Sequence, residues 1–366
     1  MYRGKIRTII VDDSAFMRKS ISIMLESDES IEIVATAKDG LEGLELIKKI
    51  KPDIVTLDIE MPRMDGLTAL KKIMEECPTS VIMVSSLTSE GAEATLTALE
   101  LGAVDFIPKE LSYININIIK IKEELIRKVK AIVSQKRAQD TLNRLIKLNP
   151  HNTDIKTGFS PNIPIKDYQA LAVGVSTGGP LSLQKVIPQL SESINKPIFI
   201  VQHMPPRFTK SLADRLNNTS ALHVKEAEKD ENVMPGTVYI APGGLQMTLK
   251  KSNNGVICIE ISEEPFETLH KPSVDVMMNS VIDVYGKKTL GLIMTGMGKD
   301  GLEAMKRLKN IGGTCIAQNE NTSVVYGMPK AIVGAGIADA VLPLEEIAFK
   351  INKVFNNERR LCGTGI

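Results

Sequence analysis

The sequence predicts an α/β protein with two domains. Its 366 residues are more than one hydrophobic core usually organises. In both halves, short apolar runs of strand length alternate with amphipathic stretches of helical period. A segment without any period, residues 148–167, separates the two halves. Such alternation is typical of parallel sheets that are covered by helices.

The first half, from Ile6 to about Lys120, carries five predicted strands. They are KIRTIIVDD, IEIVATA, DIVTLDI, SVIMVSS and VDFIPK. Amphipathic segments such as AFMRKSISIMLES and LTALKKIMEE lie between them and are predicted to be helices. We therefore expect a doubly wound, five-stranded parallel sheet with helices on both faces.

A basic helix and a linker follow this half. Apolar residues recur at helical spacing over residues 118–147, and Lys and Arg outnumber Asp and Glu there. A solvated outer face explains this charge better than a nucleic-acid patch does. Prolines, Gly158 and several asparagines then indicate an interdomain linker. We therefore predict a first domain over residues 1–125 and a helical connector with linker over 126–167. A second domain follows over 168–354, and a tail over 355–366.

The second half carries six predicted strands of its own. They are ALAVGVS, PIFIVQH, GTVYIAP, GVICIEI, TLGLIMTG and GGTCIAQ. Helical stretches such as SVDVMMNSVIDVY and DGLEAMKRLKN separate several of them. We expect a second α/β domain here, with an open Rossmann-like sheet.

The bulk composition excludes several classes of protein. A net charge of +1 gives no global attraction for nucleic acid or for an acidic membrane surface, so no nucleic-acid partner is expected. No apolar span reaches membrane length and no secretory signal is evident, so we expect a cytoplasmic protein without membrane insertion. The four cysteines are far apart and lack C-x-x-C spacing, which argues against a zinc site or a disulfide framework.

Polar residues occupy the strand ends of the first half. In strand order they are Asp12 and Asp13, Asp58, Ser85 and Lys109. A doubly wound sheet brings the carboxyl ends of its strands to one crevice. Three carboxylates that lie so close together repel one another unless a cation binds between them. A site made only of oxygen ligands suits Mg²⁺. One carboxylate could then accept a phosphoryl group whose oxygens bind the hydroxyl and the ammonium. Helix capping by the aspartates explains single positions but not the whole set.

Four motifs of this half resemble the receiver domain of bacterial response regulators, over residues 5 to about 125. They are IIVDDSAFMR, PDIVTLDIEMPRMDGL, VIMVSSLT and LGAVDFIPK. The resemblance implies a flavodoxin-like fold with Asp58 as phosphoacceptor. It implies Mg²⁺ as the cofactor of phosphorylation, with ligands from Asp12, Asp13, Asp58 and the backbone carbonyl of Glu60. Its implied switch residues are Ser85, Phe106 and Lys109.

In the second half, VGVSTGGP at residues 173–180 follows a predicted strand and admits two chemistries. Glycines after a strand let backbone amides bind a phosphate, which predicts a domain that binds a nucleotide without catalysis. The same residues contain G-x-S-x-G, in which glycines allow a sharp turn that exposes a nucleophilic serine, here Ser176. A serine nucleophile needs a base, usually an imidazole that a carboxylate orients.

Two of the four histidines are placed to act as this base. His203 directly follows the predicted strand IFIVQ, and its competitor His270 precedes a predicted helix. His223 lies away from any glycine turn or predicted strand end, which indicates an ordinary surface or packing residue. Asp300, in the glycine-flanked loop TGMGKDG, is the candidate carboxylate. Backbone amides near Met297 could stabilise an oxyanion, because glycines permit close approach.

Five motifs of this half resemble the catalytic domain of the chemotaxis protein-glutamate methylesterases, the CheB family, over about residues 168–354. They are GVSTGGP, VQHMPPRFT, YIAPGG, HKPSVDV and TGMGKDG. The resemblance implies Ser176 as nucleophile, His203 as general base and Asp300 as the orienting acid. Thr177 and Met297 would flank the site and donate backbone amides to the oxyanion. The implied reactions are hydrolysis of glutamate γ-methyl esters, which releases methanol, and deamidation of particular glutamines, with no cofactor in this half.

The same resemblance implies partners and a mode of regulation. The substrate would be the cytoplasmic helices of methylated chemoreceptors, and a chemotaxis histidine kinase would supply the phosphoryl group. In the family, an unphosphorylated receiver covers the active-site cleft and phosphorylation loosens that interface. We therefore expect a phosphorylation-activated serine hydrolase. The alternative is a response regulator whose second domain binds a nucleotide or another ligand without catalysis.

Overall fold

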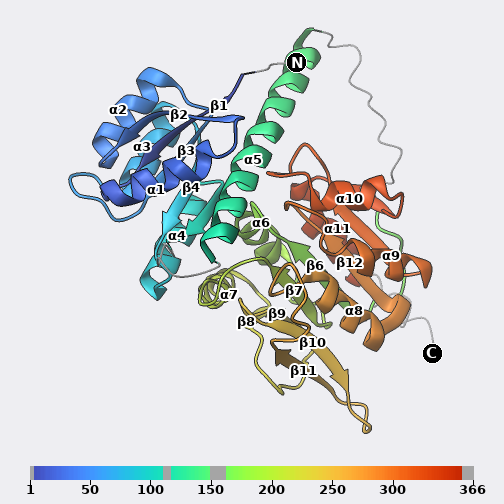
Figure 1. The fold of residues 1–366 in the computed structure, drawn as a ribbon. Coiled ribbons are helices and arrows are strands. Elements are labelled where there is room, and N and C mark those ends of the chain that lie inside the picture. Colours follow the sequence, from blue (N-terminus) through green and yellow to red (C-terminus); the bar gives the residue numbers. More distant parts are fainter. Residues whose placement is uncertain (1–3, 110–116, 149–161, 357–366) are drawn as a thin grey trace. The chain divides into compact units, whose positions relative to one another are not determined.

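The computed structural model describes residues 4–109, 117–148 and 162–356 (Figure 1). The chain divides into two compact units, Met1–Leu148 and Asn149–Ile366. Each unit is built around its own parallel sheet. Among the described residues, no helix combines the length and the apolar character needed to cross a bilayer.

The first unit contains the five predicted strands in one parallel sheet. Their order across the sheet is β2-β1-β3-β4-β5. The strands are β1 (Ile6–Val11), β2 (Ile31–Ala37), β3 (Ile54–Asp58), β4 (Ser80–Ser85) and β5 (Asp105–Pro108). Because the chain moves from β1 to β2 on one side and then to β3 on the other, the order reverses between β1 and β3. Ligands of doubly wound sheets bind at the carboxyl ends of the strands beside such a reversal.

Four helices of this unit follow the strands β1 to β4 in turn, and side chains cap their first turns. They are α1 (Ala15–Glu26), α2 (Gly40–Ile50), α3 (Gly66–Glu76) and α4 (Ser89–Glu100). The caps are Ser14, Asp39, Asp65 and Thr88, each of which accepts a backbone N–H from the first turn. These caps fix where each loop ends, so the loop residues at the carboxyl edge of the sheet are held in place.

The fifth helix of this unit, α5 (Asn117–Leu148), confirms the helix predicted over 118–147. It packs against α1, and Leu125, Val129 and Ile132 are buried. The Nζ atom of Lys128 lies 3.1 Å from the carboxylate of Asp105 and donates a hydrogen bond to the carbonyl of the next residue in β5. The predicted division between residues 125 and 126 falls inside this helix. The helix is continuous there and belongs to the first compact unit over its whole length.

The second unit contains a seven-stranded, fully parallel sheet in the order β14-β13-β12-β6-β7-β9-β8. The strands are β6 (Ala170–Val175), β7 (Ile198–Gln202), β8 (His223–Glu226), β9 (Thr237–Ile240), β12 (Thr289–Ile293), β13 (Thr314–Gln318) and β14 (Ala340–Leu342). The chain runs outward from β6 through β7 to β8 and β9, and then returns to β12 on the other side. The order of the strands therefore reverses beside β6.

The predicted strand GVICIEI is a strand but lies outside this sheet. It forms β11 (Ile257–Ser262), which pairs antiparallel with β10 (Gln246–Lys251) in a separate two-stranded ribbon. The polar turn between them, residues 252–255, allows a hairpin, and only one residue of β11 is fully buried. The sequence analysis missed β10 and the short strands β8 and β14. His223 begins β8 and is exposed there, so the expectation that no strand end lies near it was wrong.

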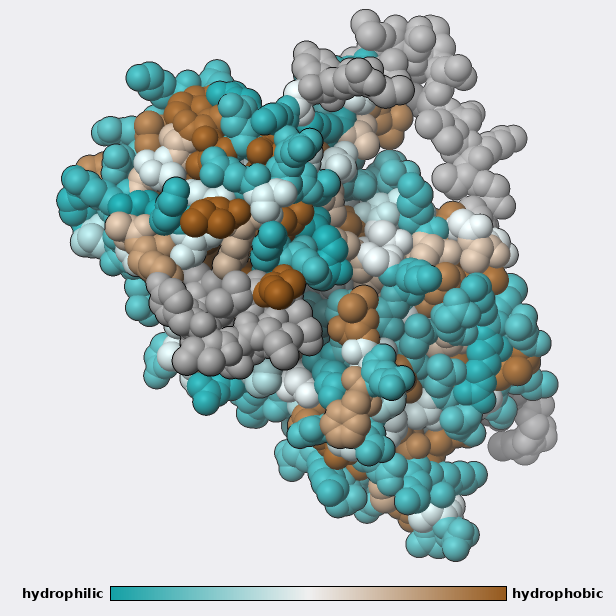
Figure 2. All heavy atoms as spheres, in the orientation of Figure 1, coloured by the Kyte–Doolittle hydropathy of each residue, from teal (hydrophilic) through white to brown (hydrophobic). Residues whose placement is uncertain are grey.

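Helices cover the sheet of the second unit. They are α6 (Gly179–Val186), α7 (Phe208–Thr219), α8 (Val274–Tyr285), α9 (Leu302–Asn310), α10 (Met328–Gly334) and α11 (Leu344–Asn356), with short 3₁₀ turns η1 (Ile187–Gln189) and η2 (Gly286–Lys288). Buried side chains of α8, α9 and α10 form one core cluster with Phe199 and Tyr239 of the central strands. On the face drawn in Figure 2, hydrophilic side chains predominate and hydrophobic ones form small separate groups, as on most protein surfaces.

Candidate functional site

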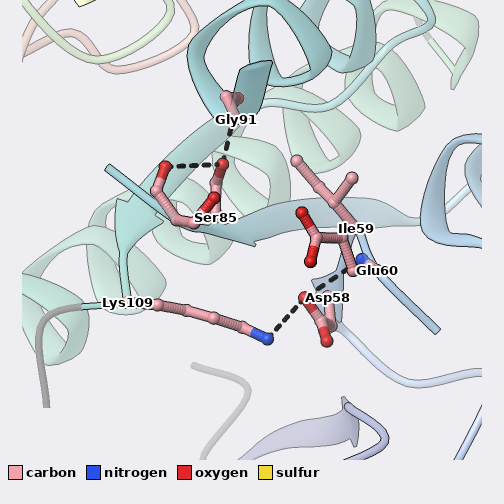
Figure 3. A pocket seen from close by; sticks show the side chains of 7 residues that line it. Asp58, Ile59, Glu60, Ser85, Gly91 and Lys109 are labelled. Carbon is pink, nitrogen blue, oxygen red and sulfur yellow. Dashed lines mark hydrogen bonds and ion pairs between the residues drawn. The ribbon is translucent and has the colours of Figure 1, made fainter. Parts of the chain in front are cut away.

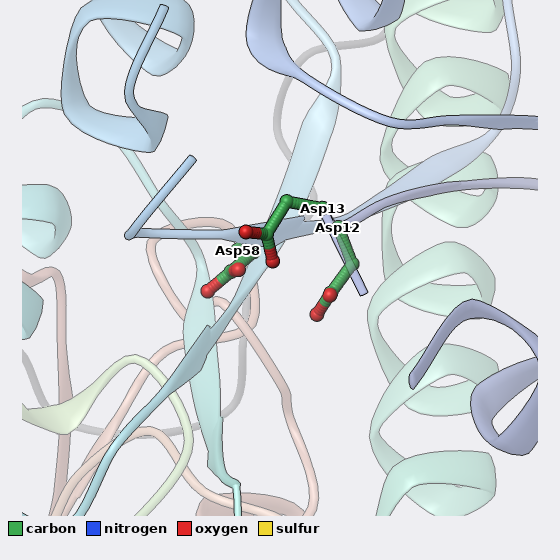
Figure 4. Close-up of side chains that lie close together, drawn as sticks. All are labelled: Asp12, Asp13 and Asp58. Atoms are coloured by element: carbon green, nitrogen blue, oxygen red, sulfur yellow. The ribbon is translucent and has the colours of Figure 1, made fainter. Parts of the chain in front are cut away.

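Three carboxylates meet at the carboxyl edge of the first sheet. Asp12 and Asp13 follow β1, and Asp58 ends β3 (Figure 4). One oxygen from each lies within 4.8 Å of the others. Asp12 and Asp58 are buried and Asp13 is exposed, so the cluster opens to solvent on one side. The structure thus brings together the three aspartates that the sequence predicted to share a crevice.

Lys109 supplies the ammonium that faces this cluster. Its Nζ lies 2.6 Å from Oδ1 of Asp58 (Figure 3). The same atom lies 3.3 Å from Oδ2 of Asp12. Burial raises the pKa of Asp58 to about 6, although the ion pair with Lys109 opposes this shift. Burial would lower the pKa of Lys109, but the carboxylate of Asp58 raises it above its usual value. Both shifts have the causes expected for buried carboxylates, those of Asp12 and Asp58, that share one ammonium.

A pocket lies beside Asp58 and Lys109. It is lined by Asp58, Ile59, Glu60, Ser85, Ser86, Gly91 and Lys109 (Figure 3). The Ser85 hydroxyl donates to the carbonyl of Gly91 at 3.1 Å, and Ser85 lines the same pocket as Asp58.

Phe106, the third predicted switch residue, lies in β5. Its side chain is buried, and the ammonium of Lys128 lies 5.5 Å from its ring centroid.

The turn after β3 requires a glycine. A Cβ atom at Gly66 would lie 1.9 Å from the carbonyl oxygen of Asp58, far inside van der Waals contact. The N–H of Gly66 also donates to the carbonyl of Ile59 at 2.8 Å. The Met-Asp-Gly sequence therefore packs the start of α3 directly against the backbone that presents Asp58, while Asp65 caps the helix.

In the second unit, Ser176 lies in the turn between β6 and α6. Its N–H donates to the carbonyl of Thr295 at 3.0 Å, and its carbonyl accepts from Gly179 at 2.8 Å. Gly178 adopts a φ of 74°, and a Cβ there would collide with Val324. The turn is therefore sharp and packed, and it leaves Ser176 partly exposed at the start of the helix.

His203 and Asp300 form a hydrogen-bonded pair beside this turn. His203 follows β7, and Nε2 of its ring lies 2.8 Å from Oδ2 of Asp300. The two side chains are only 9% and 10% exposed, so solvent screens the pair weakly. Among the described residues, Nδ1 of His203 finds no hydrogen-bond partner. A neutral imidazole that donates from Nε2 to the carboxylate keeps its basic lone pair on Nδ1.

Three neighbouring strands carry these residues. Strands β12, β6 and β7 are adjacent in the sheet, and their carboxyl ends lead to Asp300, Ser176 and His203 in that order. Gln202, at the end of β7, donates from Nε2 to the carbonyls of Ser176 and His203, at 3.0 Å each. This side chain ties the serine turn to the histidine loop.

Asp300 also holds the start of α8. Its carboxylate accepts the Ser273 hydroxyl at 3.0 Å and the N–H groups of Val274 and Asp275 at 2.7 and 3.0 Å. Burial alone would raise the pKa of Asp300, but its hydrogen bonds and the His203 ring outweigh burial and hold that pKa well below its usual range. Asp275 in turn accepts the N–H of Ala304 at 2.8 Å, so Asp300 binds the first turn of α8, which contains Asp275, and Asp275 binds the first turn of α9, which follows Asp300.

Thr177 and Met297 flank the serine turn. Thr177 is buried, and its carbonyl accepts the Thr295 hydroxyl at 2.9 Å. Met297 is half-buried and follows Gly296, where a Cβ would lie 2.8 Å from the Cβ of Ser176. The loop that carries Met297 therefore lies directly against Ser176, as the sequence predicted for site-flanking residues.

Sequence reasoning missed Gln202, Ser273 and Asp275 as supports of the pair, and it named His270 only as a competing candidate for the base. Gln202, Ser273 and Asp275 contact the site residues, and the ring of His270 stacks on that of His203 with centroids 4.0 Å apart and planes 18° apart. The motif HKPSVDV could have pointed to them, since it contains His270, Ser273 and Asp275. The spacing of these residues does not predict that they contact His203 or Asp300.

Comparison with known proteins connects both sites. The family model for the CheB methylesterase matches residues 171–351, and the model for the response regulator receiver domain matches residues 8–118. A protein-glutamate methylesterase/protein-glutamine glutaminase 1 from Oleidesulfovibrio alaskensis is 49% identical in an alignment that covers 94% of this chain and 97% of that protein. This chain belongs to the CheB methylesterase family. A second member, from Nitratidesulfovibrio vulgaris, is 48% identical over 94% of this chain and 98% of its own length.

Solved structures include parts of the CheB family. The catalytic domain of the CheB methylesterase from Thermotoga maritima is 44% identical and covers 52% of this chain and 99% of its own, with a TM-score of 0.49. Membership in the CheB family confirms the resemblance stated for both halves. It also decides against the alternative of an output domain that binds a ligand without catalysis.

Proposed function

We propose that this chain is a cytoplasmic, phosphorylation-activated serine hydrolase that demethylates glutamate γ-methyl esters on chemoreceptors and deamidates particular receptor glutamines. The relatives carry the name protein-glutamate methylesterase/protein-glutamine glutaminase. The observation that carries the proposal is the hydrogen bond between His203 and Asp300, with Ser176 in the turn after β6, the strand that lies between β12 and β7. This arrangement matches a nucleophile, a base and an orienting acid.

In the proposed reaction, Oγ of Ser176 attacks the ester carbonyl while Nδ1 of His203 takes its proton. The imidazolium that results is stabilised by Asp300 through Nε2–H. Backbone amides of Thr177 and Met297 donate to the oxyanion of the tetrahedral intermediate. Methanol leaves with the proton from His203, and a glutamyl ester of Ser176 remains.

The second half of the reaction regenerates the enzyme. His203 removes a proton from water, the hydroxide attacks the acyl-enzyme, and Ser176 leaves with that proton. The glutamic acid that forms gives its own proton to solvent and is released as the carboxylate. A glutamine substrate follows the same steps, with ammonia as the leaving group in place of methanol. One site therefore serves both reactions, because ester and primary amide share the tetrahedral intermediate.

We further propose that Asp58 accepts the phosphoryl group. Asp12, Asp13, Asp58 and the backbone carbonyl of Glu60 would hold Mg²⁺, which neutralises charge during phosphoryl transfer. The residues present fit this ion, because one oxygen from each of the three aspartates lies within 4.8 Å of the others, and Oδ2 of Asp58 is buried without a hydrogen-bond partner in the described part of the chain. Lys109 and Ser85 would bind the phosphoryl oxygens, and Phe106 would respond to the change.

The proposed partners follow from this assignment. Methylated cytoplasmic helices of chemoreceptors are the substrate, and a chemotaxis histidine kinase is the phosphodonor. The family combines a receiver with a methylesterase domain, which supports a protein substrate and a phosphodonor in general terms.

The Ser176→Ala variant tests the assignment of the nucleophile. Removal of the hydroxyl should lower the rate of methanol release from a methylated receptor by about 10⁴-fold or more, because no other group forms the acyl-enzyme. The thermal unfolding temperature should stay near that of the wild type, since Ser176 is partly exposed. Ser252→Ala, at an exposed serine in the β10–β11 turn, is the matched control. Methanol release by Ser176→Ala at the control rate would remove Ser176 from this role.

A further inference from the structure

A second histidine lies face to face with the proposed base. The ring centroid of His270 is 4.0 Å from that of His203, and the two planes differ by 18°. His203 is held at one ring atom by its hydrogen bond to Asp300. The covalent bond at Cγ and this one hydrogen bond fix two points of the ring, so its plane is set by the groups that pack against its two faces. A ring that packs against one face restricts the tilt of this plane.

The segment that carries His270 is itself held firmly. Gln246, in β10, is fully buried. Its Nε2 donates to the Thr268 hydroxyl at 2.7 Å and to the carbonyl of His270 at 3.2 Å, and its Oε1 accepts the N–H of Ser273 at 2.8 Å. The N–H of Gly244 also donates to the carbonyl of Lys271 at 3.0 Å. The backbone on both sides of His270 is therefore attached to the β10–β11 ribbon.

One side chain thereby supports two contacts of the proposed triad. Ser273, which Gln246 holds at its N–H, donates its hydroxyl to Asp300. His270, which Gln246 holds at its carbonyl, stacks on His203. The base and its orienting acid are consequently positioned from the same short segment, residues 268–273.

We propose that His270 is a positioning residue for the hydrolysis proposed above. Its ring fixes the plane of the His203 imidazole, so that Nδ1 is available to the Ser176 hydroxyl while Nε2 keeps its bond to Asp300. The expected effect on the rate of hydrolysis rests on the proposed function. The contact between the two rings does not, because it belongs to the folded chain. Its action requires an aromatic ring at position 270 and no proton transfer by His270.

Kinetics of the full chain with Mg²⁺ and a phosphodonor test this proposal. His270→Ala should lower kcat for methanol release about three- to tenfold and leave KM for the methylated receptor within about twofold, because the stack orients the base and does not hold substrate. His270→Phe should restore kcat to within about twofold of the wild type. His223→Ala, a histidine exposed at the start of β8, is the matched control and should be unchanged. If His270→Ala does not fold, His270→Gln takes its place with the same expectation.

Three kinetic results would overturn the proposal. They are a wild-type kcat in His270→Ala, a kcat in His270→Phe as low as in His270→Ala, and a loss that appears in KM alone. A phenylalanine that fails to rescue would show that His270 acts through its nitrogens.

A second measurement does not depend on catalysis. In nuclear magnetic resonance spectra of the full chain, the proton on Nε2 of His203 should exchange slowly with water, because Asp300 accepts it. This resonance should broaden or vanish in His270→Ala and persist in His270→Phe. Its persistence in both variants would overturn the positioning role. Absence of methanol release by the wild type would instead overturn the proposed function and leave this measurement valid.

Discussion

Asp300 joins the His203 ring to the start of α8 in the candidate site of the second unit. Its two carboxylate oxygens accept from a histidine ring, a hydroxyl and two backbone N–H groups. These bonds stabilise the ionised carboxylate in a place where burial disfavours charge. Orientation of His203 and the start of α8 therefore depend on one charged group.

Stability against acid should reveal this charge. The pKa of Asp300 is lower in the folded state than in the unfolded chain, where it is about 4. Its contribution is thus fully present above that pH and is lost as the pH falls through the folded pKa. Asp300→Asn should destabilise the second unit by about 1–3 kcal/mol at pH 7, and the difference from the wild type should narrow below about pH 4.

Urea unfolding at several pH values measures this difference, with the transition of the second unit followed separately. The matched control is Asp283→Asn, because Asp283 is an exposed aspartate of α8 that pairs with Arg307. A difference between Asp300→Asn and the wild type that stays constant from pH 7 to pH 3 would contradict the account.

At the scale of single residues, the sequence could place the site but not its support. Ser176, His203 and Asp300 each follow a predicted strand, and neighbouring parallel strands end at the same edge of a sheet, so their meeting was predictable. The contacts of Gln246 with His270 and Ser273 join β10 to a loop more than 20 residues later. Such contacts depend on tertiary packing, which no local pattern encodes.

At the scale of elements, the turn between β3 and α3 connects packing with the proposed phosphorylation site. Gly66 permits the first residue of α3 to lie against the carbonyl of Asp58. Any side chain at Gly66 must push the helix or the strand away, because the atoms nearest to its Cβ belong to the backbone of Asp58 and Ile59. The position of Asp58 within the acidic cluster therefore depends on the absence of a Cβ atom at Gly66.

Gly66→Ala should accordingly damage the first unit. The new Cβ would displace backbone, and we expect a loss of about 2 kcal/mol or more in the free energy of unfolding of this unit. Phosphorylation of the unit by a small-molecule phosphodonor should also slow. Gly4→Ala is the control, since nothing lies within 4 Å of a Cβ at that position. Equal unfolding temperatures for Gly66→Ala and Gly4→Ala would contradict this reading of the turn.

Strand prediction succeeded where the strands are central and apolar. All five strands of the first sheet were predicted, because each is a short apolar run between polar turns. The missed strands β8, with sequence HVKE, and β14, with sequence AVL, are short edge strands with little pattern of their own. GVICIEI was predicted to be a strand, and it is β11. Its antiparallel pairing with β10 could not be predicted, because the composition of a strand does not say which other strand it pairs with.

At the scale of the whole molecule, the chain joins a unit with an acidic crevice to a unit in which the turn of Ser176 lies beside the hydrogen-bonded pair of His203 and Asp300. The first unit matches the receiver-domain model and the second matches the CheB methylesterase model, and we propose that phosphorylation of the first governs hydrolysis by the second. About two negative charges added at Asp58 must favour one conformational state of the receiver over another. The ion pair between Asp58 and Lys109 is the contact that such a charge would change first.

Methanol release from a methylated receptor, measured with Mg²⁺ in the presence and absence of a small-molecule phosphodonor, tests this claim most directly. The wild type should release methanol faster when the phosphodonor is present, and Asp58→Asn should show the same rate with and without it. Equal activation of wild type and Asp58→Asn, or no activation of the wild type, would contradict the account.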